Sequence, residues 1–376
     1  MYVYLDNNAT TRPHPEVIDA MSKHFAESYA NPGSRHAPGR HARQALEDAR
    51  ETIARVLDAD PKEVILTSGG TESTNTALFG FADQEPGTIL LTAGEHPATV
   101  ETCRQLEPKG WTIQNLEVDS EGLLRPDQYD DIDWPSVRLA SIILAHNETG
   151  VIQDIQPLAS RCEQHSIPFH LDAVQAVGKI PISFRQSNVT SLALGAHKFH
   201  GPRGIGALIL KEGTRLPPFQ FGGHQESGLR PGTEAVALAV GMAKALEIFD
   251  RECAQRMEQT QTLRERLQSG LVERCSPTVV NGSQEHRLPN TLNIAFPGLH
   301  GEAMLVALDL EGVACSLGST CASGSADPAP ALVAMGCEEE VYSSSVRFSV
   351  SSENTVEEID AAVEKISTVI NRMRAT

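Results

Sequence analysis

The sequence SLALGAHKFHGPRGIG, residues 191–206, indicates the fold of the chain most directly. Its first five residues are typical of a short buried strand, and GPRGIG predicts a turn before a second strand, ALIL, at 207–210. His197 and Lys198 follow the first strand directly. A lysine at a strand end can reach into a cleft, and its primary amine can form a Schiff base with an aldehyde. Taken alone, the stretch is also compatible with a solvated lysine beside a plain hairpin turn.

Short apolar segments alternate with amphipathic ones on both sides of this stretch. Two helical patterns, at 15–25 and 41–58, come first. Helical or turn-forming patterns then follow a series of predicted strands: EVILTS (63–68), TILLT (88–92), LASIILA (139–145) and PFHLD (168–172). This alternation predicts an α/β fold with a mostly parallel central sheet.

The C-terminal third has a different pattern. A long helical segment from 236 to 274 leads to strand patterns at 291–296 and 346–350 and helical patterns at 302–312 and 357–373. A loop of small residues, SLGSTCASGSADPAPALVAMG (316–336), lies between those strands, and its composition predicts mobility. We therefore expect a large domain of residues 15–250 and a smaller α+β domain of residues 1–14 and 251–376.

Composition excludes several classes of protein. Asp and Glu number 49 against 31 Lys and Arg, and a net charge of −18 opposes binding to nucleic acid or to an anionic membrane. We recognise neither a secretory signal nor a membrane-spanning segment, so we expect a cytoplasmic protein. The seven cysteines are dispersed and form no CxxC pair, which argues against a disulfide framework and a structural metal site.

Polar residues or glycines follow nearly every predicted strand. Ligands of a parallel sheet bind at the carboxyl ends of its strands, so these residues are the candidates for a site. In chain order they are Gly69, Gly70, Thr71, Glu72, Glu95, His96, Asn147, Glu148, Asp172, Gln175, His197 and Lys198.

The residue types at these positions suggest particular roles. The segment SGGT, ending at Thr71, combines glycines with the start of a helix and could hold a phosphate, although Ser and Thr also serve as simple helix caps. His96 could stack on a flat ring and move protons, or cap a helix. Asp172 could pair with a protonated pyridine nitrogen, or serve as the N-cap of a helix formed by the AVQAVG segment that follows it.

Two further candidates lie in the C-terminal third. Cys321 is in the small-residue loop, where an exposed thiol can travel to a substrate. Arg347 could bind a carboxylate through its planar guanidinium, although most arginines on strands face solvent. Cys315, beside a valine and an alanine, is better explained by core packing.

Taken together, these segments resemble the cysteine desulfurases of the NifS/IscS type, in the class V aminotransferase branch of fold type I pyridoxal phosphate enzymes. The resemblance covers nearly the whole chain. Its motifs are YLDNNATT, NPGSRH, TSGGTES, GEHPATVETC, HNETGVIQD, HLDAVQAVGK, AHKFHGPRGIGAL, GLRPGT, GSTCASGS and VRFSVSSENTVEEID.

The resemblance implies a role for each candidate toward pyridoxal 5'-phosphate and L-cysteine. Lys198 would form the Schiff base, His96 would stack on the ring, Asp172 would pair with its nitrogen, and Gln175 and Asn147 would contact its phenolic oxygen. The phosphate would be held by Gly70, Thr71, His197 and, from the partner subunit of a homodimer, Thr233. Arg347, Asn147 and Asn31 would bind the substrate carboxylate, and Cys321 would be the nucleophile that takes up sulfur as a persulfide.

The chain departs from the family pattern at several positions. Gly195 occupies a place where relatives usually have a phosphate-binding serine, so this contact would fall to the backbone or be lost. Leu317 and Pro231 also replace common serines. The long segment between Cys321 and Arg347 favours free cysteine as substrate and delivery of sulfur to an acceptor protein, as in iron–sulfur cluster assembly.

Other functions remain open at this point. The same cofactor would serve a selenocysteine lyase, a cysteine sulfinate desulfinase or an aminotransferase. A non-catalytic sulfur carrier or scaffold would have the same fold without the catalytic activity.

Overall fold

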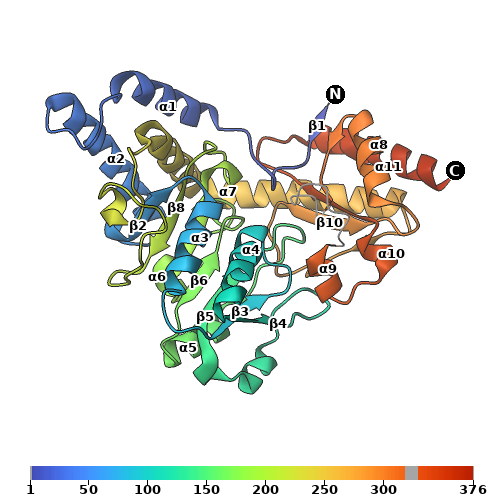
Figure 1. The fold of residues 1–376 in the computed structure, drawn as a ribbon. Helices are drawn as coiled ribbons and strands as arrows, with labels where there is room; N and C mark the ends of the chain where they lie inside the picture. The colour runs from blue at the N-terminus through green and yellow to red at the C-terminus, as the bar shows by residue number, and fades with distance from the viewer. Residues whose placement is uncertain (1, 318–328, 376) are drawn as a thin grey trace.

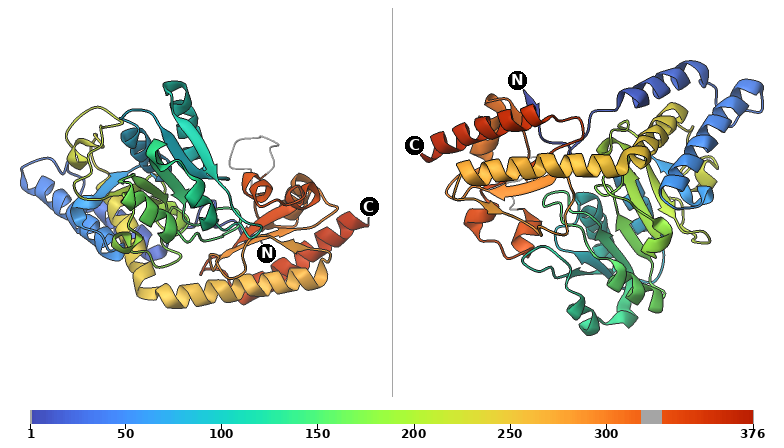
Figure 2. Two further views of the ribbon diagram at one scale, coloured as in Figure 1. Left: turned by 90° about the horizontal axis from the view of Figure 1, so that it is seen from below. Right: turned by 180° about the vertical axis from the view of Figure 1, so that it is seen from behind.

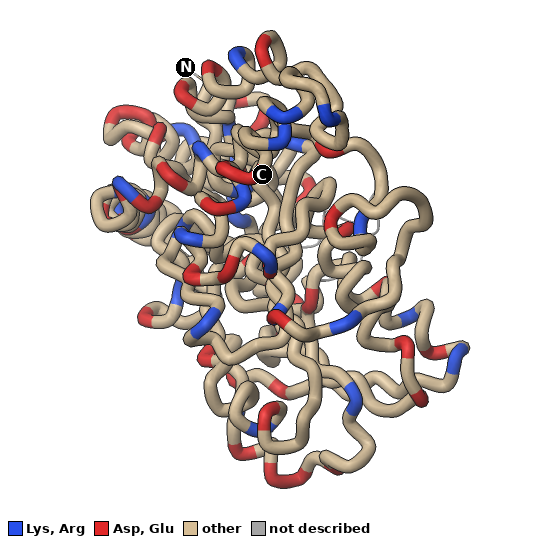
Figure 3. Tube along the Cα trace, turned by 90° about the vertical axis from the view of Figure 1, so that its left-hand side faces the viewer, with Lys and Arg blue, Asp and Glu red and all other residues tan. Residues whose placement is uncertain are grey.

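The computed structural model describes residues 2–317 and 329–375. A large α/β unit is built around one sheet, and a smaller unit contains the C-terminal strands and helices (Figure 1). Lys and Arg are interspersed with Asp and Glu along the described trace (Figure 3). Within the described part of the chain, every helix is too short or too polar to cross a membrane.

The central sheet has seven strands in the order β2-β8-β7-β6-β5-β3-β4. Strand β8 is antiparallel to both of its neighbours, and all other neighbouring pairs are parallel. The mostly parallel sheet expected from the sequence is therefore confirmed. Its strands are β2 (Val64–Thr67), β3 (Thr88–Thr92), β4 (Thr112–Leu116), β5 (Val137–Ile143), β6 (Phe169–Asp172), β7 (Ser191–Gly195) and β8 (Gly206–Leu210).

Strand β4 was not predicted from the sequence. It lies at the edge of the sheet, and most of its residues are partly or fully exposed. Its sequence, TIQNL, lacks the apolar run that marks the buried strands.

Both faces of the sheet are covered by helices, which explains why the strands other than the edge strand β4 are mostly apolar along their length. Alternate residues point to opposite faces, so Ile65 packs with α3 (Gly70–Phe81) and α4 (Pro97–Leu106). Its neighbours Val64 and Leu66 pack in the core on the other face. The helices that contribute to that second core are α1 (Pro15–Glu27), α2 (Ala37–Val56), α5 (Gln156–Gln164), α6 (Phe184–Ser187) and the first part of α7 (Val236–Arg274).

Helix α7 is continuous through 39 residues and runs from the large unit to the smaller one, as both views of Figure 2 show. Its residue Leu246 belongs to the core of the large unit, and its residue Leu267 belongs to a separate core cluster. The predicted helix at 236–274 is confirmed. The predicted domain boundary at residue 250 falls inside this helix and stays a prediction.

The smaller unit has its own hydrophobic core and two small sheets. The three-stranded sheet has the order β12-β10-β9, and in the other sheet the N-terminal strand β1 pairs with β11. Its strands are β1 (Val3–Tyr4), β9 (Val279–Val280), β10 (Thr291–Ala295), β11 (Val313–Ala314) and β12 (Ser345–Ser349). Its helices are α8 (Gly301–Leu310), α9 (Pro330–Ala334), α10 (Glu339–Tyr342) and α11 (Val356–Arg374).

The structure refines two local expectations. The helix expected after Asp172 is wrong, because residues 173–178 contain turns and no helix. The last part of the predicted loop at 316–336 contains α9. Cys321, the predicted nucleophile, lies outside the described residues.

Candidate active site

A cavity of about 250 Å³ opens at the carboxyl ends of the strands. Because parallel strands end at one edge of the sheet, residues from distant parts of the chain meet there. The predicted site residues that line the cavity are Gly70, Thr71, His96, Asn147, Asp172, Gln175, His197 and Lys198. Ala98, Ile143 and Val174 complete its wall.

The start of α3 forms one end of this cavity. The residue before the helix, Gly69, has no side chain that could cap the first amides, so the helix terminus keeps donors for an anion. Gly70 and Thr71 stand in the first turn. The fit of a phosphate group to this end rests on those amides and on the positive end of the helix dipole.

Gly195, at the end of β7, stands next to the same helix terminus. A Cβ atom added at this position would lie 3.4 Å from the amide nitrogen of Gly70 and 3.7 Å from Cδ2 of His197. Gly195 therefore lies beside the start of α3 without supplying a side chain to the cavity, and its role toward a phosphate stays a prediction.

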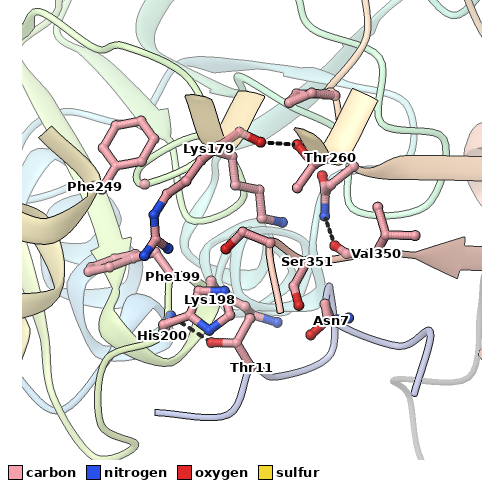
Figure 4. A pocket seen from close by; sticks show the side chains of 15 residues that line it. Asn7, Thr11, Lys179, Lys198, Phe199, His200, Phe249, Thr260, Val350 and Ser351 are labelled. Carbon is pink, nitrogen blue, oxygen red and sulfur yellow. Dashed lines mark hydrogen bonds between the residues drawn. The ribbon is translucent and has the colours of Figure 1, made fainter. Parts of the chain in front are cut away.

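Lys198 is held by the N-terminal segment. Its Nζ atom donates to the main-chain oxygens of Asn8 at 2.7 Å and Ala9 at 2.9 Å. The side chain also lines a second, smaller cavity of about 40 Å³ (Figure 4). The prediction that this amine reaches into a cleft agrees with its position between the two cavities.

His96 caps a helix and also lines the cavity, so the capping role is shown and the role toward a flat ring stays a prediction. Its Nδ1 atom accepts a hydrogen bond from the amide of Ala98 at 3.1 Å, which caps α4, and its ring lines the cavity. Burial lowers the pKa of His96, and the negative charge of Asp172 opposes this effect. A ring held in this way can stack on a flat ligand.

Asp172 is buried at the end of β6, and its Oδ1 atom accepts a hydrogen bond from the amide of Val174 at 3.0 Å. The capping role is therefore present, although the capped segment is a turn. A buried carboxylate that lines a cavity is a suitable partner for a cationic nitrogen.

Arg347 lies on β12 and is buried, which rules out the surface role common for arginines on strands. It donates to the main-chain oxygen of Asn147 at 3.0 Å and to Oδ1 of Asp6 at 2.7 Å. Arg347 thus contacts a residue of the cavity wall from the smaller unit.

Asn31 and Thr233 are not brought to this cavity within a single chain. Both are exposed and line a separate cavity of about 470 Å³, together with the aromatic residues Phe25 and Tyr29. Thr233 was expected to act from a partner subunit, so its distance from the chain's own cavity leaves that expectation open.

Cys315 is buried in the core of the smaller unit, as the sequence suggested. Burial raises the pKa of its thiol to about 12, so it is a poor nucleophile.

Sequence reasoning did not assign roles to Asn8, Lys179 and Glu95. Asn8 accepts from Lys198 through its main-chain oxygen and from Lys179 through its side chain. Glu95 precedes His96, is buried, and accepts from Thr92 and from the amide of Ile143. Each of these residues lies within a motif shared with the family: YLDNNATT, HLDAVQAVGK or GEHPATVETC. The motifs could have marked them as candidates, but the sequence alone did not predict their hydrogen bonds.

Burial raises the pKa of Glu95 to about 8, and the nearby charge of Asp172 adds to this effect. Glu95 is therefore a neutral acid at moderate pH. Among the described residues, no group of three or more His, Cys, Asp or Glu side chains is arranged to hold a metal ion.

Comparison with known proteins agrees with this geometry. The model of the aminotransferase class-V family, whose members are pyridoxal phosphate enzymes in general, matches residues 3–362. A cysteine desulfurase IscS from Dictyoglomus turgidum is 40% identical over 375 residues, which cover 99% of this chain and 95% of that protein.

Two solved structures have the same fold. A NifS-like protein superimposes with a TM-score of 0.93 at 35% identity and covers 99% of this chain and 100% of its own. SspA, solved in complex with cysteine, gives a TM-score of 0.83 at 30% identity over 94% of this chain and 100% of its own. The chain therefore belongs to the class-V aminotransferase family and, within it, to the cysteine desulfurases of the NifS/IscS type.

Proposed function

We propose that this protein is a pyridoxal 5'-phosphate-dependent cysteine desulfurase that converts L-cysteine to L-alanine and transfers the sulfur to its own Cys321. The observation that carries the proposal is the cavity in which a lysine amine, a buried carboxylate, an imidazole and a helix terminus face one another. These are the groups that a phosphorylated pyridine aldehyde requires.

Each residue that lines the cavity would have a separate role in binding the cofactor. The start of α3 and His197 would hold the phosphate, Asp172 would keep the ring nitrogen protonated, and His96 would cover the ring face. Bound pyridoxal phosphate supplies an electron sink and an aldehyde carbon for an amine.

Lys198 would bind the cofactor, release it to the amino group of cysteine, and then act as the base that moves the α-proton. Burial and, as a smaller effect, the charge of Lys198 lower the pKa of His197 to about 4, so His197 is a neutral hydrogen-bonding group beside the lysine at neutral pH.

The sulfur step needs a thiolate, and none of the described residues that line the cavity is a cysteine. The thiolate of Cys321 would form a bond with the substrate sulfur as the carbon–sulfur bond breaks, and the electron pair of that bond would be protonated on carbon to give alanine. The persulfide left on Cys321 would then pass to an acceptor protein, as in iron–sulfur cluster assembly.

We also propose that the protein acts as a homodimer. Phe25 is 62% and Tyr29 is 77% exposed, and they adjoin the cavity that contains Asn31 and Thr233. A second copy packed on this face would bury the aromatic rings and carry Thr233 toward the neighbouring site. Light scattering of the purified protein would test this. A monomer at micromolar concentration would contradict it.

The central experiment measures alanine and sulfide production from L-cysteine, with and without reductant, and looks for an added sulfur atom on the Cys321 peptide by mass spectrometry. We expect Cys321→Ala to abolish cysteine turnover and to keep most activity on selenocysteine, which does not strictly need the enzyme thiol. Retained cysteine turnover in this variant would contradict the proposal. A protein without the visible absorbance of bound pyridoxal phosphate would instead fit a non-catalytic carrier.

A further inference from the structure

Lys179 is a second lysine next to Lys198. It lies at the end of the turns after β6, and both lysines line the smaller cavity (Figure 4). Its Nζ atom donates to Oδ1 of Asn8 at 2.7 Å and to Oε1 of Gln175 at 2.5 Å. Lys179 does not line the larger cavity, so its effect on a ligand there must pass through another residue.

These contacts fix the direction of the Gln175 amide. Because Oε1 accepts from Lys179, Nε2 faces the opposite way and donates to the main-chain oxygen of Asn8 at 2.9 Å. That same oxygen accepts from Lys198 at 2.7 Å. A side-chain amide nitrogen carries two hydrogens, so Gln175 keeps a second N–H for a ligand in the larger cavity, which it lines.

Like the Gln175 amide, the side chain of Asn8 is fixed by hydrogen bonds on both its oxygen and its nitrogen. Its side-chain oxygen accepts from Asn290 at 3.0 Å as well as from Lys179, and its side-chain nitrogen donates to Oγ1 of Thr291 at 2.9 Å. The Lys179–Asn8–Gln175 group is therefore anchored to the smaller unit and does not turn freely.

The charges around Lys179 favour an anion nearby. Burial lowers its pKa well below the ordinary value, and the positive charges of Lys198 and Arg347 lower it further. Arg256 lines the same small cavity and adds a positive charge. His200 also lines it but is neutral at neutral pH, because burial lowers its pKa to about 4. Both the N–H of Gln175 and this surrounding positive charge stabilise a negatively charged oxygen more than a neutral one.

We propose that Lys179 is a positioning residue, which holds Oε1 of Gln175 so that the amide presents an N–H to the ionised ring oxygen of bound pyridoxal phosphate. The inference rests on the proposed function, because it needs that cofactor in the larger cavity. Without Lys179, only the hydrogen bond from Nε2 to the main-chain oxygen of Asn8 orients the amide, so conformers that turn Oε1 toward the ring oxygen become more populated, and Oε1 repels a negative oxygen. The ionised ring oxygen then becomes a stronger base.

The test is a double-mutant cycle on the full chain with Lys179→Met and Gln175→Ala. Two readouts are followed: the affinity of the apoprotein for pyridoxal 5'-phosphate, and the pH at which the visible absorbance band of the bound cofactor changes. We expect Lys179→Met to weaken binding about tenfold, the effect of losing one charge-assisted hydrogen bond, and to move the spectral transition to higher pH. The double variant should be no weaker than Gln175→Ala alone, since Lys179 acts through Gln175.

Two further variants separate positioning from a general loss of structure. Lys179→Gln keeps a donor for Oε1 of Gln175 and should restore most of the wild-type spectrum. Lys211→Met removes an exposed lysine and should leave both readouts at the wild-type value. Thermal melting confirms that each variant is folded.

The experiment distinguishes failure of the inference about Lys179 from failure of the proposed function. If the wild-type protein does not bind pyridoxal phosphate, the proposed function fails. If it binds but Lys179→Met matches wild type, or if the effects of the two substitutions simply add, the inference about Lys179 alone is overturned.

Discussion

The guanidinium of Arg347 joins strand β12 to the N-terminal segment through a 2.7 Å ion pair between its Nη2 atom and Oδ1 of Asp6. Its Nη1 atom donates to the main-chain oxygen of Asn147, and within residues 2–317 and 329–375 its Nε atom has no partner. Only 1% of the arginine side chain is exposed. A buried, fixed guanidinium with an unpartnered donor is suited to a carboxylate ligand.

We expect Arg347→Lys to raise KM for L-cysteine about tenfold or more, because lysine keeps the charge but cannot offer the same planar pair of donors. Pyridoxal phosphate affinity should change little. Steady-state kinetics and a cofactor titration measure the two effects. Arg266→Lys, at a half-exposed arginine paired with Asp360, is the matched control. An unchanged KM would mean that Arg347 serves only to join the two units.

Glu95→Gln should alter the pH dependence of stability in the cofactor-free protein. The pKa of Glu95 is about 8 in the folded state and 4.5 ordinarily, so between these values the folded protein keeps a proton that the unfolded chain releases. The contribution of Glu95 to the free energy of unfolding is therefore fully present below about pH 4.5 and falls by up to about 1.4 kcal/mol per pH unit as the pH rises toward 8.

Urea unfolding of both proteins at several pH values measures this difference, since other titrating groups cancel in the comparison. The wild-type protein should lose stability relative to Glu95→Gln as the pH rises through that window. A constant difference would show that Glu95 is ionised in the folded protein.

Cys315→Ala should leave desulfurase activity close to the wild-type value, because the thiol is buried and its raised pKa of about 12 keeps it protonated. Removing the buried sulfur should lower stability by about 1 kcal/mol. Iodoacetamide labelling of the native protein followed by peptide mass spectrometry adds a second measurement. Rapid labelling of Cys315, or loss of activity in its folded alanine variant, would give this residue a role in sulfur transfer.

Gly195→Ser should be tolerated and should tighten pyridoxal phosphate binding severalfold. The new Cβ atom would stand in ordinary contact with Gly70, and the hydroxyl would add a donor to the phosphate end of the cavity. Gly70→Ala is the opposite case, since its Cβ atom would lie 2.5 Å from Cγ2 of Val174. We expect this variant to bind the cofactor more weakly. Equilibrium titration of both apoproteins with pyridoxal phosphate tests the two predictions. Weaker binding by Gly195→Ser would show that the cavity has no room for a hydroxyl at the start of α3.

Much of the fold could be predicted from the sequence because its signals are local. The apolar runs around Leu90 and Leu171 are buried on both faces of the sheet, and such runs mark central strands. Strand β4 gave no such signal, because an edge strand is half exposed and owes its conformation to pairing with β3.

The sequence by itself determined most of the strands and helices, in their order along the chain, and the residue types at the strand ends, since these depend on periodicity and on chain direction. Only the tertiary structure decided that Lys179 and Lys198 share Asn8, that Arg347 is buried against Asp6, and that Thr233 lies away from the chain's own cavity. These relationships join residues far apart along the chain. They are set by the packing of one unit against the other, which no local pattern encodes.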